Sequence, residues 1–101
     1  MPKLDKEKIF ELLKKNKYQL QKYGVYRIGL FGSYARRENN EESGIDFLVE
    51  FEEDQKKYDN FIELVFFLEN LFNKKVDLLT PDSISPYLKP YILREIEFEI
   101  I

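Results

Sequence analysis

The 101-residue chain has no cysteine, no histidine and no tryptophan, and the first two absences narrow the chemistry open to it. Without cysteine there is no disulfide, no thiol nucleophile and no zinc–thiolate site. Without histidine there is no imidazole base and no His-ligated metal. Any catalysis must therefore use carboxylates, hydroxyls, Lys, Arg or Tyr, or a hard cation held by oxygen ligands.

Long apolar runs and an excess of positive charge are also missing. No stretch approaches the roughly 20 apolar residues that span a bilayer, and the N-terminal sequence MPKLDKEKIF is not a signal peptide. We therefore expect a cytoplasmic protein with no membrane contact. The net charge is −3, which makes nucleic acid an unfavourable direct ligand, because phosphate backbones attract basic surfaces.

The composition is that of a globular protein. Hydrophobic residues make up 44% of the chain and charged residues 35%, which is typical of folded rather than disordered sequences. A chain of this length buries roughly two thirds of its unfolded surface, enough for one hydrophobic core. We expect a single domain over residues 1–101.

The hydrophobic pattern predicts helices that alternate with strands. We expect helices from Asp5 to about Tyr23 and from about Tyr58 to Phe72, and strands at Val25–Phe31, Ile45–Phe51 and Lys74–Thr80. Gly24 and Asn73 are well placed to end the two helices, because both residue types tolerate a left-handed backbone. These elements predict an α/β (α+β) fold in which helices flank a small mixed sheet.

Prolines near the C-terminus indicate further helix starts. Thr80-Pro81 and Ser85-Pro86 each place a capping residue before a proline suited to the first helical position. Pro90 lies too deep for one regular helix that starts at Pro86, so we expect a kink or a restart there.

The predicted helix that contains FIELVFFLENLF is apolar on more than one face. A domain this small can hardly cover all of that surface. We therefore expect part of this helix to contact a partner protein or a second copy of the chain, as a stable complex or a homo-oligomer.

The Gly32-Ser33 turn is the first candidate for a binding site. A turn that leaves a strand and enters a short helix presents free backbone N–H groups and a hydroxyl, which suit phosphate oxygens. Arg36 and Arg37 add positive charge for a polyphosphate. The alternatives are an ordinary turn with a helix cap, and a solvated basic loop.

Two carboxylates lie inside predicted strands, at Asp46 and Asp77. A strand carboxylate is disfavoured unless it has a function or a partner. If the two strands are neighbours in the sheet, these side chains converge into an oxygen-ligand site for Mg²⁺, the usual companion of nucleotide phosphates. The alternative for each is a carboxylate that caps a loop or pairs with Arg27 or a lysine.

Together these residues resemble the minimal nucleotidyltransferases of the DNA polymerase beta-like superfamily, the antitoxin type paired with a HEPN-domain toxin. The family pattern is Gly-Ser, ten residues, Asp-x-Asp, and a third carboxylate on a later strand. Here these positions are Gly32-Ser33, Gly44-Ile45-Asp46 and Asp77. The segments IGLFGSYARRE and IDFLVEF and the tail YLKPYILREIEF are also similar to the family.

The resemblance implies a nucleotidyltransferase fold and an adenylyltransferase activity. It implies ATP as the nucleotide, Mg²⁺ as the metal, and AMP transfer to a tyrosine hydroxyl of a HEPN-type toxin, which silences the RNase activity of the toxin. Gly32, Ser33 and Arg36 would bind the phosphates. Asp46 and Asp77 would bind the metal, and Asp77 would also help to remove the proton of the attacking hydroxyl.

Gly44 is the main departure from the family pattern, and Arg37 stands where the family usually has Gly. Residues 44 and 46 face the same side of a strand, so an Asp at both would chelate cations between them. Loss of one such ligand removes several kcal/mol of transition-state stabilisation, which is orders of magnitude in rate. Glu50 lies roughly 13 Å along the strand from Asp46, too far to replace it.

Two other acids, Glu41 and Glu42, remain conceivable water-mediated ligands from the loop before the second strand. The sequence leaves two interpretations open. Either the chain is a nucleotidyltransferase impaired by Gly44, or it is a binding-only antitoxin. A binding-only antitoxin would use the Phe61–Phe72 helix or the acidic loop Glu38–Glu42.

Overall fold

The computed structural model describes residues 3–55 and 58–101. Its elements are α1 (Lys6–Lys15), α2 (Lys17–Lys22), β1 (Val25–Phe31), β2 (Ile45–Phe51), α3 (Tyr58–Phe72), β3 (Val76–Leu79), the 3₁₀ helix η1 (Pro81–Ser83), α4 (Lys89–Glu95) and β4 (Glu97–Ile100). The strands form one sheet in the order β3-β2-β1-β4. Strand β1 is antiparallel to β2 and β4, whereas β2 is parallel to β3. The predicted mixed sheet flanked by helices is confirmed.

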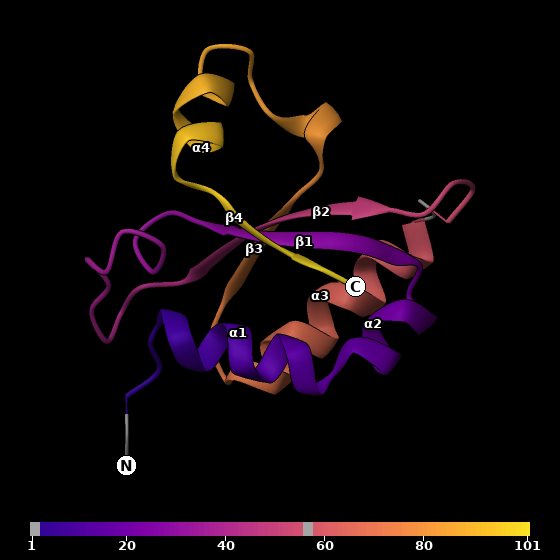
Figure 1. Ribbon diagram of the computed structural model, residues 1–101, viewed down its shortest axis with the longest axis horizontal. Coiled ribbons are helices and arrows are strands. Elements are labelled where there is room, and N and C mark those ends of the chain that lie inside the picture. Colours follow the sequence, from indigo (N-terminus) through magenta and orange to yellow (C-terminus); the bar gives the residue numbers. More distant parts are fainter. Residues whose placement is uncertain (1–2, 56–57) are drawn as a thin grey trace.

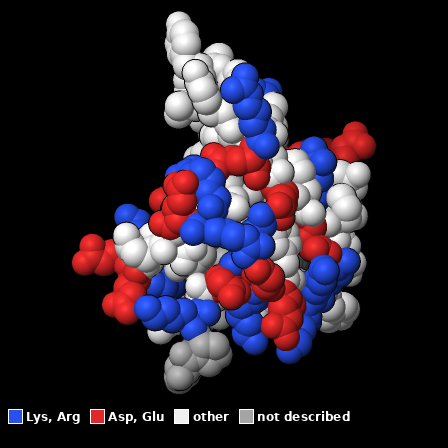
Figure 2. All heavy atoms as spheres, turned by 60° about the vertical axis from the view of Figure 1, so that its left-hand side comes forward, with Lys and Arg blue, Asp and Glu red and all other residues white. Residues whose placement is uncertain are grey.

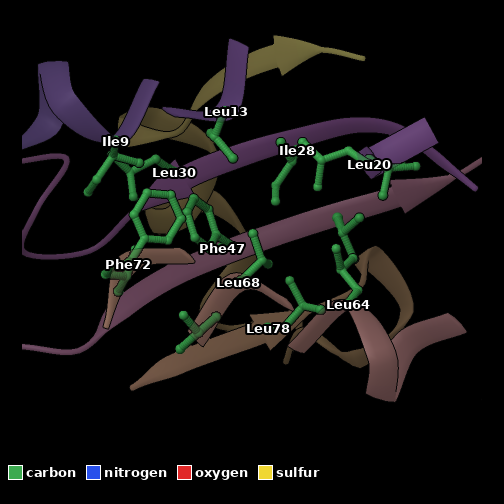
Figure 3. Packing of buried hydrophobic residues seen from close by; sticks show 14 of the residues in the cluster. Ile9, Leu13, Leu20, Ile28, Leu30, Phe47, Leu64, Leu68, Phe72 and Leu78 are labelled. Atoms are coloured by element: carbon green, nitrogen blue, oxygen red, sulfur yellow. The ribbon is translucent and has the colours of Figure 1, made fainter. Parts of the chain in front are cut away.

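The sheet has a helical layer on each face (Figure 1). Helices α1, α2 and α3 cover one face, and η1 and α4 arch over the other. The alternation predicted for β2 is confirmed, because Phe47 packs into the core under α1–α3 whereas Leu48 packs against Ile84 and Ile92 on the α4 side. Figure 3 shows the larger core, where side chains from three helices meet the sheet: Ile9, Leu13, Leu20, Ile28, Leu30, Phe47, Leu64, Leu68, Phe72 and Leu78.

The predicted N-terminal helix is broken into two. Asp5 caps α1, and its carboxylate accepts from the Lys8 N–H at 2.8 Å. The side-chain amide of Asn16 then donates to the Leu12 carbonyl at 2.7 Å, a local bond that competes with continuation of the helix. After α2 the chain turns at Gly24, whose φ of +81° is the left-handed conformation expected at a helix end.

Helix α3 has the predicted bounds, and Asn73 ends it with a φ of 52°. Most of the apolar surplus in α3 packs onto the core as partly buried side chains: Phe61, Val65, Phe67 and Leu71. Among the phenylalanines of α3, Phe66 is the one left mainly exposed, at 64%. The apolar part of α3 that remains exposed for a partner is therefore small. Within the described ranges, no helix has the length and apolar character that crossing a membrane requires.

The C-terminal segment differs most from expectation. The predicted third strand shortens to β3, since Thr80 turns into η1 and its N–H donates to the Ser83 hydroxyl at 3.0 Å. The helix expected at Ser85-Pro86 is a turn, and α4 begins instead at Lys89, next to the restart predicted at Pro90. Strand β4 was not predicted, because the alternation EFEI is only four residues long and directly follows a helical pattern.

Candidate active site

The two strand aspartates lie side by side at one edge of the sheet. Asp46 is the second residue of β2 and Asp77 the second residue of β3, and the two are direct register partners in the parallel pair. Partners in neighbouring strands have α-carbons about 4.8 Å apart and side chains on the same face. The topology therefore brings these two carboxylates together, although 31 positions separate them in the sequence.

The electrostatics of this pair are unfavourable without a cation. Burial is the largest cause that raises the pKa of Asp46, and the neighbouring Asp77 carboxylate raises it further; Arg36 acts in the opposite direction. A carboxylate that is both desolvated and repelled gains by binding positive charge. Arg27, one of the alternative partners considered for Asp46, instead donates from Nε to Glu50 at 2.6 Å.

The Gly32-Ser33 turn lies directly beside Asp46. Strand β1 ends at Phe31, the register partner of Asp46. Gly32 has a φ of +79°, and a Cβ built there would collide with Oδ2 of Asp46. The carboxylate thus rests against the bare α-carbon of Gly32, and this close approach needs glycine.

The short helix expected after Gly32-Ser33 is replaced by overlapping turns over residues 33–37. The Arg36 N–H donates to the Gly32 carbonyl at 3.1 Å, and the Glu38 N–H to the Ser33 carbonyl at 2.8 Å. The backbone N–H groups of residues 33–35 and the Ser33 hydroxyl donate to no acceptor among the described residues. Consecutive unused N–H groups are the donor set that binds anions.

The two arginines after the turn have different partners. The Arg36 guanidinium donates to Glu38 and to Glu95 at the end of α4, and these bonds raise its pKa. Arg37 adopts a φ of 61° and pairs with Glu7 of α1. The structure therefore places Arg36, whose charge acts on Asp46, at the rim of the site, while Arg37 ties the turn to α1.

No third acid joins the pair in residues 3–55 and 58–101, where the structure contains no group of three acidic residues that could hold a metal ion. The Glu41 carboxylate forms an ion pair with the Lys3 ammonium at 3.7 Å. The backbone carbonyl of Glu41 accepts a hydrogen bond from the Lys74 ammonium at 2.6 Å. Gly44 immediately precedes β2 and contributes no side chain. Figure 2 brings this edge forward and shows acidic and basic side chains interleaved, with no single-sign patch.

Sequence reasoning missed Glu95 and the tie between the turn and α1. The Lys6 ammonium donates to the Ala35 carbonyl at 3.2 Å and to Glu97 at 2.6 Å, and so links α1, the turn and β4. Nothing in the spacing pointed to these contacts, because Lys6 and Glu97 are 91 positions apart. A hollow of about 450 Å³ lies beside α1, and its lining does not include the aspartate pair.

Gly32→Ala should destabilise the protein by about 2–4 kcal/mol, the sum of a left-handed alanine and a clash in a packed region. Urea unfolding measures this loss. Gly44→Ala is the matched control, because no left-handed φ applies there and its Cβ would lie 3.2 Å from one backbone oxygen, that of Lys75. Equal unfolding free energies for the two variants would contradict the close approach of Asp46 to Gly32.

Comparison with known proteins identifies the class to which this fold and site belong. The family model described as the nucleotidyltransferase domain matches residues 7–101, and the chain therefore belongs to this family. Among curated proteins, it is 39% identical over 99 residues to protein adenylyltransferase MntA of Thermococcus cleftensis, covering 97% of this chain and 99% of that protein. It is 45% identical over 95 residues to a candidate protein adenylyltransferase of Methanocaldococcus jannaschii, with 92% of each chain covered.

Solved structures support the same assignment. A candidate minimal nucleotidyltransferase matches with a TM-score of 0.79 and 30% identity, covering 96% of this chain and 98% of the other. A chain from a toxin–antitoxin structure with AMP-PNP matches with a TM-score of 0.65 and 27% identity, covering 94% of this chain and 72% of the other. A Shewanella oneidensis complex of a tri-AMPylated HEPN toxin with an MNT antitoxin matches at 23% identity and a TM-score of 0.62, which shows the shared fold. The predicted minimal nucleotidyltransferase family and fold are confirmed.

Proposed function

We propose that this chain is the antitoxin of a toxin–antitoxin pair and transfers AMP from ATP to a tyrosine hydroxyl of a HEPN-type toxin, at a rate impaired by Gly44. The observation that carries the proposal is the register pairing of Asp46 with Asp77 beside the unused N–H groups of the Gly32-Ser33 turn. Relatives named as adenylyltransferases support the reaction, and neighbours in toxin–antitoxin complexes support the partner.

The turn is suited to the phosphates of ATP. The N–H groups of residues 33–35 and the Ser33 hydroxyl donate to no acceptor among the described residues, so they form a set of donors that a phosphate can use. Arg36 contributes a guanidinium, which binds phosphate oxygens more strongly than a neutral donor does. These groups would bind the β- and γ-phosphates and stabilise the negative charge that develops on the pyrophosphate leaving group.

The paired carboxylates fit a divalent cation. Asp46 and Asp77 supply carboxylate oxygens from adjacent strands. Burial and the charge of Asp77 raise the pKa of Asp46, so a bound cation would relieve an unfavourable concentration of negative charge. Asp46 and Asp77 would hold Mg²⁺, which when bound supplies positive charge to the reacting phosphate.

Asp77 is the more exposed of the two acids and the one accessible to an acceptor protein. Its carboxylate would take the proton of the tyrosine hydroxyl as the phenolic oxygen attacks the α-phosphorus of ATP. A bond forms between that oxygen and the α-phosphorus, the bond from the α-phosphorus to the bridging oxygen breaks, and pyrophosphate leaves. Asp46 would orient the α-phosphate for this in-line displacement.

A binding-only antitoxin is the second candidate, and Gly44 is the observation that favours it. With two acids in place of three, the site has less negative charge to hold a cation than the family pattern provides. In this case the chain would neutralise its partner by occupying the surface of the toxin, without ATP.

One experiment separates the two functions. The chain is mixed with a HEPN-type RNase toxin, with and without ATP and Mg²⁺, and both RNase activity and the intact mass of the toxin are measured. The adenylyltransferase predicts a mass gain of whole AMP units and a loss of RNase activity that needs ATP. Full neutralisation without ATP, at unchanged mass, would establish the binding-only antitoxin instead.

A further inference from the structure

The guanidinium of Arg36 is held by two carboxylates from different parts of the chain. Its Nη1 donates to both oxygens of Glu95, at 2.9 and 3.2 Å, and its Nε donates to Glu38 at 3.0 Å. The side chain of Glu95 is 23% exposed and that of Glu38 is 65% exposed. The Glu95 bond is therefore the less solvent-screened of the two.

This arrangement leaves part of the guanidinium available. Of its three nitrogens, Nη2 has no acceptor within hydrogen-bond distance in the described part of the chain. The guanidinium is a rigid planar fork, so fixing Nε and Nη1 also fixes the direction of the Nη2 donors. The two Nη2 N–H groups thus have a set orientation and no acceptor among the described residues, on an arginine whose charge acts on Asp46.

The position of Glu95 in the fold also needs an explanation. It is the last residue of α4, where a helix carries partial negative charge and a carboxylate is unfavourable. Its contact with Arg36 compensates for that cost and joins the α4 arch to the turn after β1, 59 positions away. The same contact places the positive charge of Arg36 against Glu95, which offsets part of the repulsion between Glu95 and an incoming polyphosphate.

We propose that Glu95 is a positioning residue for nucleotide binding: it holds Arg36 at the rim of the Asp46–Asp77 site so that the remaining N–H groups meet the polyphosphate of ATP. This inference rests on the proposed function. An arginine side chain loses much rotamer freedom when it is fixed. Glu95 imposes that loss in the free protein, which makes ATP binding tighter than it would be with a mobile Arg36.

The test is a double-mutant cycle on ATP affinity, measured by calorimetry in Mg²⁺. Glu95→Ala should weaken ATP binding about tenfold, the usual scale for loss of a charged hydrogen bond. Glu95→Gln should weaken it about threefold, because the amide oxygen still accepts from Arg36. In an Arg36→Ala background, Glu95→Ala should have no further effect, because the residue that it positions is gone.

Two controls separate positioning from general effects of charge or folding. Glu99→Gln removes the same charge from nearby β4, where Glu99 pairs with Lys17 at 3.3 Å and does not contact Arg36, and it should leave ATP affinity within about twofold of wild type. The Tm of each variant reports whether the fold is intact. Tighter ATP binding by Glu95→Ala would make Glu95 a competitor for Arg36, and equal losses in both backgrounds would make its role purely structural; either result overturns the proposal.

A second measurement needs no nucleotide. In the free protein, the NMR relaxation of the Arg36 Nε–H group should report a rigid side chain that becomes mobile in Glu95→Ala. An equally rigid Arg36 in that variant would overturn the proposal regardless of ATP. A wild-type protein that binds no ATP would overturn the proposed function, and the inference with it. If the wild type binds ATP and Glu95→Ala binds it equally well, only the inference about Glu95 is overturned.

Discussion

Asp46→Asn is expected to reduce AMP transfer by about 10³-fold or more and, at the same time, to raise the Tm at pH 7 by roughly a few degrees. The rate falls because an amide neither replaces the charge of the ligand nor holds a cation beside Asp77. The stability rises because Asn has a similar shape but escapes the burial and the repulsion from Asp77 that raise the pKa of Asp46. Opposite changes in activity and stability are typical of functional sites that retain unfavourable charges.

The pH dependence of the stability follows from the raised pKa of Asp46. The pKa of Asp46 in the folded protein is raised above its ordinary value of 3.8. The stability that the protonated acid contributes is therefore fully present below about pH 4 and is lost as the pH rises through the folded-state pKa. The Tm values of the wild type and of Asp46→Asn should differ most at neutral pH and converge toward pH 4.

Mg²⁺ provides the control for this prediction. Added Mg²⁺ should raise the Tm of the wild type, because a ligand that binds the folded state stabilises it, and should raise that of Asp46→Asn much less. If Asp46→Asn is instead less stable than wild type at pH 7, then Asp46 has a favourable partner in the folded protein and the description of the acid pair is wrong.

Gly44→Asp is expected to raise AMP transfer by roughly 10²–10³-fold, since a restored carboxylate ligand returns several kcal/mol at about 1.4 kcal/mol per decade. Gly44 lies two positions before Asp46, immediately ahead of β2. If the strand alternation extends back to it, a carboxylate at this position projects toward the Asp46–Asp77 pair. A Cβ at this position would lie 3.2 Å from the carbonyl oxygen of Lys75. The Lys75 carbonyl, which accepts from the Ile45 N–H at 2.9 Å, must therefore give by a few tenths of an ångström.

A third acid also adds repulsion, so Gly44→Asp should lower the Tm in the absence of Mg²⁺ and recover it when Mg²⁺ is added. Gly44→Ala and Gly44→Asn are the matched controls, because they add the same Cβ or nearly the same shape without a charge, and neither should gain activity. If Gly44→Asp transfers no AMP to a HEPN-type toxin and shows no response to Mg²⁺, the proposed adenylyltransferase function is wrong and the binding-only antitoxin stands.

Much of this structure is readable from short-range patterns. The strands Val25–Phe31 and Ile45–Phe51 and the helix Tyr58–Phe72 have the predicted bounds, because long stretches of clear periodicity dominate local structure. Strand β4 was missed because four residues carry too little signal, and its pairing with β1 decides its conformation. The break at Asn16 depends on one side-chain bond to Leu12, which competes with a helix that the pattern otherwise supports.

The candidate site likewise has features that the sequence predicts and features that depend on the tertiary structure. Its individual residues follow from the spacing of Gly32-Ser33, Asp46 and Asp77, since residue type limits the chemistry that a chain without cysteine or histidine can perform. Their proximity was conditional on the order of the strands, and only the pairing of β2 with β3 placed the two carboxylates together. Glu95 had no sequence signal at all, because a contact over 59 positions depends on where α4 crosses the sheet.

By itself, therefore, the sequence determined the membership of the chain in the nucleotidyltransferase family, the order of most of its elements, and the absence of a carboxylate at Gly44, because these depend on residue identity and spacing. Only the tertiary structure decided that Asp46 is partly buried beside Asp77, that the charge of Arg36 acts on Asp46 while Arg37 pairs with Glu7 of α1, and that α4 contacts Arg36 through Glu95. The physical reason is that the strength of a charge interaction depends on distance and burial, and both are set by how the elements pack.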